Sequence, residues 1–493
     1  MRRNINKVIY VVFQSFATVA VALILSCARK PVNVTQLDAL PDIYPDYKEV
    51  TVPVNIAPLN FLIRGDSCDA LNVVAECNDV VVYADCESDE VTFDMRDWKR
   101  LMSESVGCSI RVTVSKSLNG EWVQYKPFHI MVSSDSIDSY LTYRMIEPDY
   151  EVYSRLRIVE RCVENFWERS ICDYESVGNR CMNCHTYNSH DSRQSFLYVR
   201  GEGGGMILNQ NGNLRKLALK TEEMVSGSVY AQFSPNGRWL VFSTNKIIPA
   251  FHARPSKRLE VFDTKSDIYI ADMASNKVVR NPLLADSTHL ETFPTFSSDG
   301  KIIYFCSAER LPHIGNIDSL QYDLCRVSFD ERTGEIGDTI ETLIKSKKGE
   351  KQSVCHPRVS PDGEFLLYTV ADYGTFPIWH PEADLQMMNL RNSTIYKLES
   401  VNSSKSDTYH SWSSNSRWFV FASKRDDGLY GKLYFCHIDD NGTTSKPFVL
   451  PQESPSFYDY CLKSFNVPEM GKSRLPFTPE DVAYAIKSDA ESF

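Results

Sequence analysis

The stretch Phe233-Ser-Pro-Asn-Gly-Arg-Trp-Leu-Val-Phe-Ser243 decides the fold, because the chain repeats its pattern three more times. The other copies are Phe296-Ser-Ser-Asp-Gly-Lys-Ile-Ile-Tyr-Phe-Cys306, Val359-Ser-Pro-Asp-Gly-Glu-Phe-Leu-Leu-Tyr-Thr369 and Trp412-Ser-Ser-Asn-Ser-Arg-Trp-Phe-Val-Phe-Ala422. The copies begin at residues 233, 296, 359 and 412, so their spacings are 63, 63 and 53 residues. A recurring period of this length indicates a repeat architecture.

Each copy is typical of two strands joined by a tight turn. Proline supplies a fixed φ, glycine supplies the left-handed position, and the apolar residues that follow form the second strand. A third strand is predicted downstream of each copy, over residues 266–272, 322–327, 383–388 and 431–436. Since one hairpin cannot bury both of its faces, we expect antiparallel sheets stacked radially into a β-propeller.

These residues resemble the TolB-like propeller repeat, in which a Ser-Pro-Asp-Gly turn precedes the second strand and Asp-Ile-Tyr marks the third. Two turns, 297–300 and 413–416, depart from that pattern with residues that still tolerate turns. Weaker strands are predicted over 196–217 and around 448–465. The resemblance implies about six blades, and we assign residues 195–493 to this propeller.

The segments before the propeller have a different pattern. Short β-branched and aromatic runs at 71–75, 79–83, 109–114 and 122–132 predict a small antiparallel, sandwich-like β domain over residues 50–139. Over residues 140–194 the apolar positions, such as Leu156, Val159 and Val163, are spaced more as on a helix, so we predict a short helical or loop linker. The predicted fold class is therefore mostly β.

The N-terminus has the pattern of an export signal, with Arg2, Arg3 and Lys7 before an apolar run from Val8 to Leu25. A transmembrane anchor is the alternative reading. Ile24-Leu-Ser-Cys27 resembles a bacterial lipobox, which implies removal of residues 1–26 and lipidation of Cys27. Residues 27–49 would then be a tether, and the protein would be lipid-anchored in the cell envelope, facing the periplasm.

The motif Cys181-Met-Asn-Cys-His185 predicts covalent attachment of a c-type haem. Cysteines three residues apart on a helical turn face the same way and can form thioethers to the two haem vinyl groups. His185 follows at once and would bind the iron axially. Cys181, Cys184 and His185 are therefore the predicted cofactor site, with His185 as the metal ligand.

Three other readings of this motif stay open. A zinc site would need two further ligands, of which only His190 is near in sequence. A thioredoxin-like redox pair would need a βαβ unit, and the third reading is a structural disulfide.

For the sixth ligand of the iron we favour His252, in a long loop that also carries Arg254 and Arg258 for the haem propionates. The other candidates are His190, Met206 and Met224.

Composition restricts the partners. The chain has 493 residues, 64 of them acidic and 53 basic, and its net charge of -11 gives no general attraction to nucleic acid. Its 14 cysteines suit an oxidising compartment, in which Cys68, Cys77, Cys86 and Cys108 are close enough along the chain to pair. No Gly-x-Ser-x-Gly motif is present, which argues against a hydrolase of the prolyl-oligopeptidase type.

The chain as a whole resembles bacterial lipoproteins that join a small β domain, one CxxCH motif and a TolB-like propeller. The first hypothesis is a monohaem c-type protein for electron transfer, whose propeller docks a protein partner in the cell envelope. The alternative is a non-enzymatic binding or scaffold lipoprotein in which CxxCH is structural. A haem enzyme with an open sixth position is a third reading.

Overall fold

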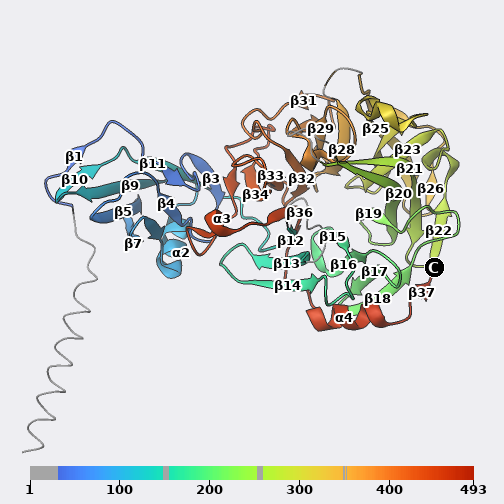
Figure 1. The fold of residues 1–493 in the computed structure, drawn as a ribbon, viewed down its shortest axis with the longest axis horizontal. Helices are drawn as coiled ribbons and strands as arrows, with labels where there is room; N and C mark the ends of the chain where they lie inside the picture. Colours follow the sequence, from blue (N-terminus) through green and yellow to red (C-terminus); the bar gives the residue numbers. More distant parts are fainter. Residues whose placement is uncertain (1–30, 148–154, 252–258, 348–349, 351) are drawn as a thin grey trace, which may run out of the picture.

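The computed structural model describes residues 31–147, 155–251, 259–347, 350 and 352–493. The predicted signal peptide and Cys27 lie outside these residues. Figure 1 shows a smaller N-terminal domain beside a larger ring of sheets. In the part that the structure describes, no helix is long and apolar enough to cross a membrane.

The N-terminal domain contains two sheets that share one core. The seven-stranded sheet has the order β1-β10-β9-β11-β3, with β5 and β6 beside β9, and the four-stranded sheet has the order β2-β4-β8-β7. The strands of the larger sheet are β1 (Thr35–Gln36), β3 (Val50–Pro53), β5 (Ala70–Cys77), β6 (Val80–Tyr83), β9 (Ser109–Leu118), β10 (Glu121–Gln124) and β11 (Phe128–Ser133). Those of the smaller sheet are β2 (Ile43–Tyr44), β4 (Phe61–Ile63), β7 (Asp85–Glu87) and β8 (Glu90–Thr92).

Three features of this domain differ from the prediction. The domain also contains a helix, α2 (Met95–Glu104), whose N-cap Asp94 accepts bonds from two backbone N–H groups and whose Trp98 is fully buried. Two of its strand pairs, β1–β10 and β3–β11, are parallel. The predicted tether contributes strands β1 and β2, and Tyr47 is only 1% exposed, because its ring belongs to the shared core.

Beyond this domain, the described residues form six sheets, which we number as blades 1 to 6 in chain order. Their strands pair antiparallel except for β18 and β37 of blade 2, which are parallel. Blade 1 contains β12 (Tyr140–Ile146), β13 (Arg157–Cys162), β14 (Glu168–Asp173) and β36 (Ser464–Gly471). Blade 2 contains β15 (Met182–Asn188), β16 (Asp191–Val199), β17 (Gly205–Gln210), β18 (Asn213–Ala218) and β37 (Glu491–Ser492). Blade 3 contains β19 (Val229–Phe233), β20 (Trp239–Phe251), β21 (Leu259–Asp272) and β22 (Lys277–Arg280).

Blades 4 to 6 complete the ring. Blade 4 contains β23 (His289–Phe296), β24 (Ile302–Glu309), β25 (Asp323–Asp330), β26 (Glu335–Ile336) and β27 (Glu341–Ile344). Blade 5 contains β28 (Ser353–Val359), β29 (Phe365–Ala371), β30 (Asp384–Asn389) and β31 (Ile395–Tyr396). Blade 6 contains β32 (Asp407–Trp412), β33 (Trp418–Ser423), β34 (Lys432–His437) and β35 (Phe448–Val449). The short helices are η1 (Pro282–Leu284), η2 (Ile314–Ser319), η3 (Pro377–Trp379), α3 (Phe457–Tyr460) and α4 (Pro479–Lys487).

The inner strands of the six sheets close a ring. Strand β15 contacts β19, β19 contacts β23, and the contacts continue through β28 and β32 to β36, which contacts β15 again. Figure 1 shows these strands facing the centre of the larger body. The architecture is therefore a β-propeller, and its ring is closed by β36, a strand from the C-terminal part of the chain that pairs with β12.

The predicted helical linker over residues 140–194 is wrong. The described part of this segment forms β12, β13 and β14 of blade 1 and β15 of blade 2, which carries the CxxCH motif. Five of the six residues of β13 are buried, because a blade lies between two neighbouring blades and is covered on both faces. A strand that is buried on both faces does not alternate apolar and polar residues, so the spacing of its apolar residues resembled that of a helix.

The recurring turns have the predicted chemistry. The hydroxyl oxygen of a buried serine accepts a bond from the backbone N–H five residues later in each copy; these serines are Ser234, Ser297, Ser360 and Ser413. The fourth turn position has a positive φ: 71° at Gly237, 71° at Gly300, 76° at Gly363 and 62° at Ser416. The serine therefore ties the turn to the strand that follows it.

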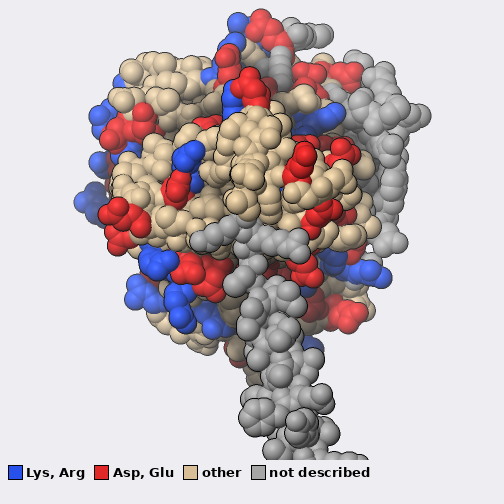
Figure 2. Space-filling model, turned by 90° about the vertical axis from the view of Figure 1, so that its left-hand side faces the viewer, with Lys and Arg blue, Asp and Glu red and all other residues tan. Residues whose placement is uncertain are grey.

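The N-terminal domain is docked on blade 6 and α3. Trp418 Nε1 donates to the Asp135 carbonyl (3.0 Å), Asn60 Nδ2 donates to the Glu453 carbonyl (2.9 Å), and Arg64 pairs with Asp459 (2.7 Å). One hydrophobic cluster extends through both bodies. Figure 2 shows that acidic and basic side chains are interspersed on the face seen there, with no large area of one sign.

Candidate functional site

Cys181 directly precedes β15, the inner strand of blade 2, and the rest of the CxxCH motif lies on this strand. The register of β15 against β16 shifts between Met182 and His185, so two residues of β15 bulge where β16 has one. Cys181 packs against the core cluster that contains Met182, and Cys184 belongs to the cluster between blades 2 and 3. The motif therefore lies at a bulge of the strand and not on a helical turn.

The two cysteines are held by backbone contacts. The Cys181 carbonyl accepts a bond from the Arg200 N–H (2.8 Å), and the Cys184 sulfur accepts one from the Tyr230 N–H (3.4 Å) of blade 3. Burial raises the pKa of the Cys184 thiol above its ordinary value. Cys184 is therefore a protonated thiol at neutral pH when nothing is bound to it.

All six inner strands have a register shift at this level. The shift lies between Val229 and Gln232 in β19, and equivalent shifts occur in β23, β28 and β32 and opposite β12 in β36. In five of these strands, the first of the two bulged residues has a φ between 46° and 51°. These residues are Tyr230, Phe293, His356, Tyr409 and Val467. The bulges turn one side chain of each strand out of the regular alternation.

Four of these side chains form a collar of flat rings, which we call the aromatic collar: Tyr230, Phe293, His356 and Tyr409. The ring centroids of Tyr230 and Phe293 are 4.3 Å apart, those of Phe293 and His356 are 4.1 Å apart, and those of His356 and Tyr409 are 4.7 Å apart. Such tilted rings stabilise one another beyond their area of burial. The collar lies on consecutive blades and curves around part of the axis.

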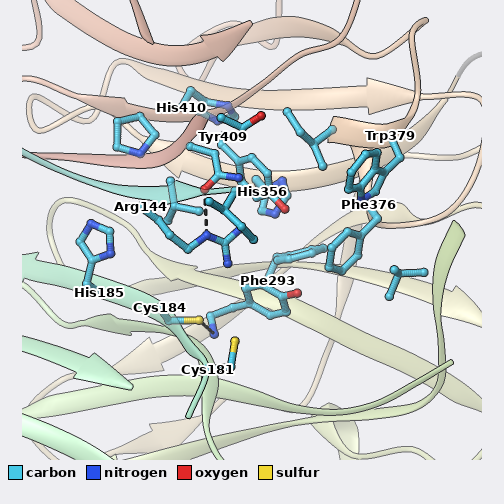
Figure 3. A pocket seen from close by; sticks show the side chains of 18 of the residues that line it. Arg144, Cys181, Cys184, His185, Phe293, His356, Phe376, Trp379, Tyr409 and His410 are labelled. Carbon is cyan, nitrogen blue, oxygen red and sulfur yellow. Dashed lines mark hydrogen bonds between the residues drawn. The ribbon is translucent and has the colours of Figure 1, made fainter. Parts of the chain in front are cut away.

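A cavity of about 400 Å³ lies against the collar at the centre of the ring. Cys181, Cys184 and His185 all line it, together with the collar and with Phe376 and Trp379 of blade 5 (Figure 3). This volume lies within the usual range for small-molecule sites, which are mostly apolar with a few fixed polar groups. The cavity is the candidate functional site.

Most charged side chains of the cavity lining are cationic, namely Arg144, Arg200, Arg358 and Lys424. The lining contains one carboxylate, that of Glu147. Arg144 Nε donates to Asn466 Oδ1 (2.9 Å), and Arg358 pairs with Glu469 (2.5 Å). Glu147 pairs with Lys463 (3.2 Å). The cavity therefore favours anionic groups.

Three histidines line the cavity and are uncharged at neutral pH. His185 is only 7% exposed, and neither of its ring nitrogens has a hydrogen-bond partner. Burial lowers the pKa of His185 to about 4 and that of His410 to about 3, and it lowers the pKa of His356 well below its ordinary value. Neutral imidazoles can act as metal ligands.

The described candidates for the sixth iron ligand do not line the central cavity. His252, Arg254 and Arg258 lie outside the described residues. His190 lies by a second cavity of about 250 Å³, and its Nδ1 contacts the Met470 carbonyl (3.1 Å). Met206 and Met224 are buried in the hydrophobic core between blades 2 and 3 and do not line the central cavity.

The sequence analysis missed several cavity residues, among them the collar, His410, Arg144 and Arg200. A signal for the collar exists, because Tyr230, Phe293, His356 and Tyr409 each stand four residues before the serine of a repeat turn. Nothing local in the sequence marks Arg144 or Arg200, which reach the cavity only through the closure of the ring.

The described cysteines are all free, so the structure does not pair Cys68, Cys77, Cys86 or Cys108. Cys306, Cys325 and Cys436 are buried in the blades. In the described part of the chain, no group of three or more His, Cys, Asp or Glu side chains is placed to hold a metal ion, so the zinc reading lacks its further ligands there. The thioredoxin reading does not fit, because β15 is followed by its antiparallel hairpin partner β16 and not by the helix of a βαβ unit.

Comparison with known protein families and with curated proteins gives no match to this chain. Solved structures give distant likenesses. TolB from Acinetobacter baumannii has 12% identity and a TM-score of 0.42, over 76% of this chain and 85% of that one. A hypothetical selenium-binding protein from Sulfolobus tokodaii has 9% identity and a TM-score of 0.39, over 83% and 95% of the two chains.

Prolyl oligopeptidase B from Galerina marginata has 10% identity and a TM-score of 0.37, over 63% of this chain and 45% of that one. At such identities and scores, these likenesses define neither a family nor an activity for the chain. The class that the coordinates define is a β-propeller with a central cavity lined by a CxxCH motif.

Proposed function

We propose that this chain is a monohaem c-type protein of the cell envelope, with its haem in the central cavity of the propeller. The observation that carries the proposal is that Cys181, Cys184 and His185 all open on one cavity. Electron transfer to a protein partner that docks on the propeller is the role that we assign to it.

The residues present suit such a group. Cys181 and Cys184 both line the central cavity, as two thioether bonds to one haem require. His185 is buried, uncharged at neutral pH and without a hydrogen-bond partner, so it can bind iron without first losing a bond or a proton. When bound, the haem supplies one-electron chemistry.

The protein's own residues would bind, orient and shield the group. Cys181 and Cys184 hold it covalently, and the aromatic collar and Trp379 provide an apolar wall that excludes water. Arg144 and Arg200 lie in the same lining, where guanidinium groups suit carboxylates. His356 and His410 are the further cavity residues that can act as iron ligands.

Expression of the full chain in a host that matures c-type cytochromes tests this proposal. We expect haem that stays attached to the polypeptide under denaturing conditions, seen as a pyridine haemochrome spectrum of the unfolded chain. Cys181→Ser together with Cys184→Ser should abolish it, and Cys108→Ser, at an exposed cysteine, should not. Absence of covalent haem from the protein of the native host would overturn the proposal.

The lipid anchor is part of the same proposal, because it places the motif where c-type haem is attached. Replacement of Cys27 by Ser should move the protein from the membrane fraction to the soluble periplasmic fraction, and Cys108→Ser should leave it in the membrane fraction. Retention of the Cys27→Ser protein in the membrane fraction would count against lipidation at this residue.

A second candidate is a binding protein in which the cavity takes a small ligand and the thiols stay free. The observation that favours it is the register of β15, in which Met182 and His185 pair with Val199 and Leu197 and so share one face of the sheet. Cys184 packs in a different core cluster, between blades 2 and 3, away from that face. Iron, haem and free-thiol analysis of the native protein separates the candidates, because this one predicts two reactive thiols and no haem.

A further inference from the structure

The Arg200 side chain opens on the central cavity and has no anionic partner in the described residues. Arg200 directly follows β16, and its backbone N–H is fixed by the Cys181 carbonyl. Arg200 lines the cavity, its charge interacts with the cavity residues Tyr230, Cys184 and Cys181, and its Nε is buried and makes no hydrogen bond. A buried cation without a partner is costly, so this arrangement favours an anion supplied from outside the chain.

Among the residues that the structure describes, the neighbouring charges do not supply this anion. Glu469 is occupied by Arg358, and Glu147 is occupied by Lys463. The side chains that interact most with the Arg200 charge are tyrosines and thiols, namely Tyr230, Tyr198, Cys184 and Cys181. Arg200 therefore faces the cavity among groups that are neutral when protonated.

The wall next to Arg200 is flat and aromatic. Tyr230, whose N–H binds Cys184, is the first ring of the aromatic collar, and its centroid lies 6.2 Å from that of His356. Rings held at the bulges of the inner strands give a rigid surface for a planar molecule. Figure 3 shows Cys181 and Cys184 around the same space as Phe293, His356 and Tyr409 of the collar.

From this juxtaposition we propose that the cavity binds a planar ligand that carries a carboxylate, with the carboxylate on Arg200 and the planar body on the aromatic collar. The carboxylate has two possible sources, a propionate of a bound haem or a free aromatic acid. The site rests on Arg200 and the collar, so it stands whether or not the haem proposal holds.

Matched probes test the site in protein with Cys181→Ser and Cys184→Ser, in which no group can be attached. We expect 2-naphthoate to bind about 10- to 100-fold more tightly than methyl 2-naphthoate, because the ester cannot make a charge-assisted bond to a guanidinium. Isothermal titration calorimetry measures both affinities. Equal affinity for acid and ester, or no binding of either probe, would overturn the proposal.

Arginine variants in the same background assign the discrimination to one residue. Arg200→Gln should weaken binding of the acid by about 10-fold or more and leave binding of the ester unchanged. Arg200→Lys should keep part of the preference for the acid. Arg332→Gln, at an exposed residue, should change neither affinity. Thermal unfolding of each variant checks that the fold is kept. Full preference for the acid in folded Arg200→Gln protein would contradict the assignment.

Haem-loaded wild-type protein distinguishes the two sources. Loss of 2-naphthoate binding on loading shows that a propionate takes the Arg200 position, whereas binding in both forms assigns the site to a free acid. If native protein contains no haem, the function proposed above fails, and the acid-over-ester preference still decides this inference.

Discussion

Blade 2 and blades 3 to 6 have the same bulged inner strand but different sequences. In blade 3 the shifted residues are Tyr230 and Ala231 and a Ser-Pro-Asn-Gly turn follows, whereas in blade 2 they are Asn183 and Cys184 and the turn contains Ser189 and His190. The backbone geometry at the axis is therefore set by position in the ring and not by the repeat motif. The bulge positions are free to carry different chemistry in each blade.

The turns show what the repeat motif does. In blades 3 to 6 a buried serine ties the turn to the second strand, and a glycine or Ser416 takes the left-handed position. In blade 2 the turn is shorter, and Ser189 and His190 have φ values of 47° and 65°. The hairpin at the inner strand is therefore closed by two kinds of turn, the repeat turn in blades 3 to 6 and the shorter turn in blade 2. Four predictions test the differences between blade 2 and blades 3 to 6.

The largest expected effect is that of Trp418→Ala in blade 6. Trp418 is fully buried at the start of β33, packs on Phe448 and binds the Asp135 carbonyl, whereas β16 of blade 2 begins with Asp191 and Ser192. We expect a loss of about 3–5 kcal/mol in the free energy of unfolding, measured by urea denaturation.

Ile395→Ala is the control for this variant, because Ile395 is 46% exposed and should change stability by less than about 0.5 kcal/mol. If Trp418→Ala lowers the free energy of unfolding by less than about 1 kcal/mol, the stability of blade 6 does not depend on the large apolar residue that begins the second strand of its repeat.

The second prediction concerns acid stability. His185 follows the bulge in blade 2 as Gln232 does in blade 3, and its pKa of about 4 in the folded protein lies below its ordinary unfolded value of about 6.5. The unfolded state then binds more protons between pH 6.5 and 4, so stability falls as the pH falls through this window, by up to about 3 kcal/mol.

His185→Gln should remove that part of the loss in protein with Cys181→Ser and Cys184→Ser, as urea denaturation at several pH values measures. His129→Gln, at a half-exposed histidine, serves as the control. An unchanged pH profile in the His185→Gln protein would show that this imidazole does not titrate in the folded state as expected.

The third prediction is about 2 kcal/mol of destabilisation for Gly237→Ala. The φ of 71° disfavours any Cβ, and a Cβ here would meet Gln194 and the Asn188 amide of blade 2, whose side chains bind each other. Urea denaturation gives the value. Gly300→Ala has a similar φ but meets only the end of the Glu331 side chain, so it should cost less; equal costs would exclude a clash between blades 2 and 3.

The smallest effect is expected for Ser360→Ala, about 1 kcal/mol, because the Phe365 N–H and Asp362 lose their hydroxyl partner in a buried turn. Ser189→Ala, in the exposed turn of blade 2, should stay within about 0.5 kcal/mol. Urea denaturation of both variants compares the two kinds of turn directly, and equal losses would remove the distinction drawn between them.

The sequence predicted blades 3 to 6 because turn signals are local: proline, glycine and a capping serine act within five residues. Blade 1 left no such signal, since β12 receives its inner partner β36 from more than 300 residues further along the chain. Its doubly buried strands also lacked the alternation that identifies a half-exposed strand.

The residues of the candidate site also fall into those that local sequence predicted and those that it did not. Cys181, Cys184 and His185 were predicted from spacing alone, and the structure brings them to one cavity. The predicted helical turn was wrong, because the motif lies at the start of β15, where the strand has a β-bulge. Arg200 and the collar depend on ring closure, which no window of sequence contains.

The closing strand β36 has a consequence for the order of assembly. Ser464, Asn466, Val467 and Pro468 form part of the cavity wall, and they belong to β36, which is the last of the six inner strands along the chain. While a chain emerges from its N-terminus, Cys181 and Cys184 appear long before this wall exists. If haem is attached as proposed, the attachment enzyme would therefore meet open thiols on an unfinished ring, and completion of the ring would enclose the product.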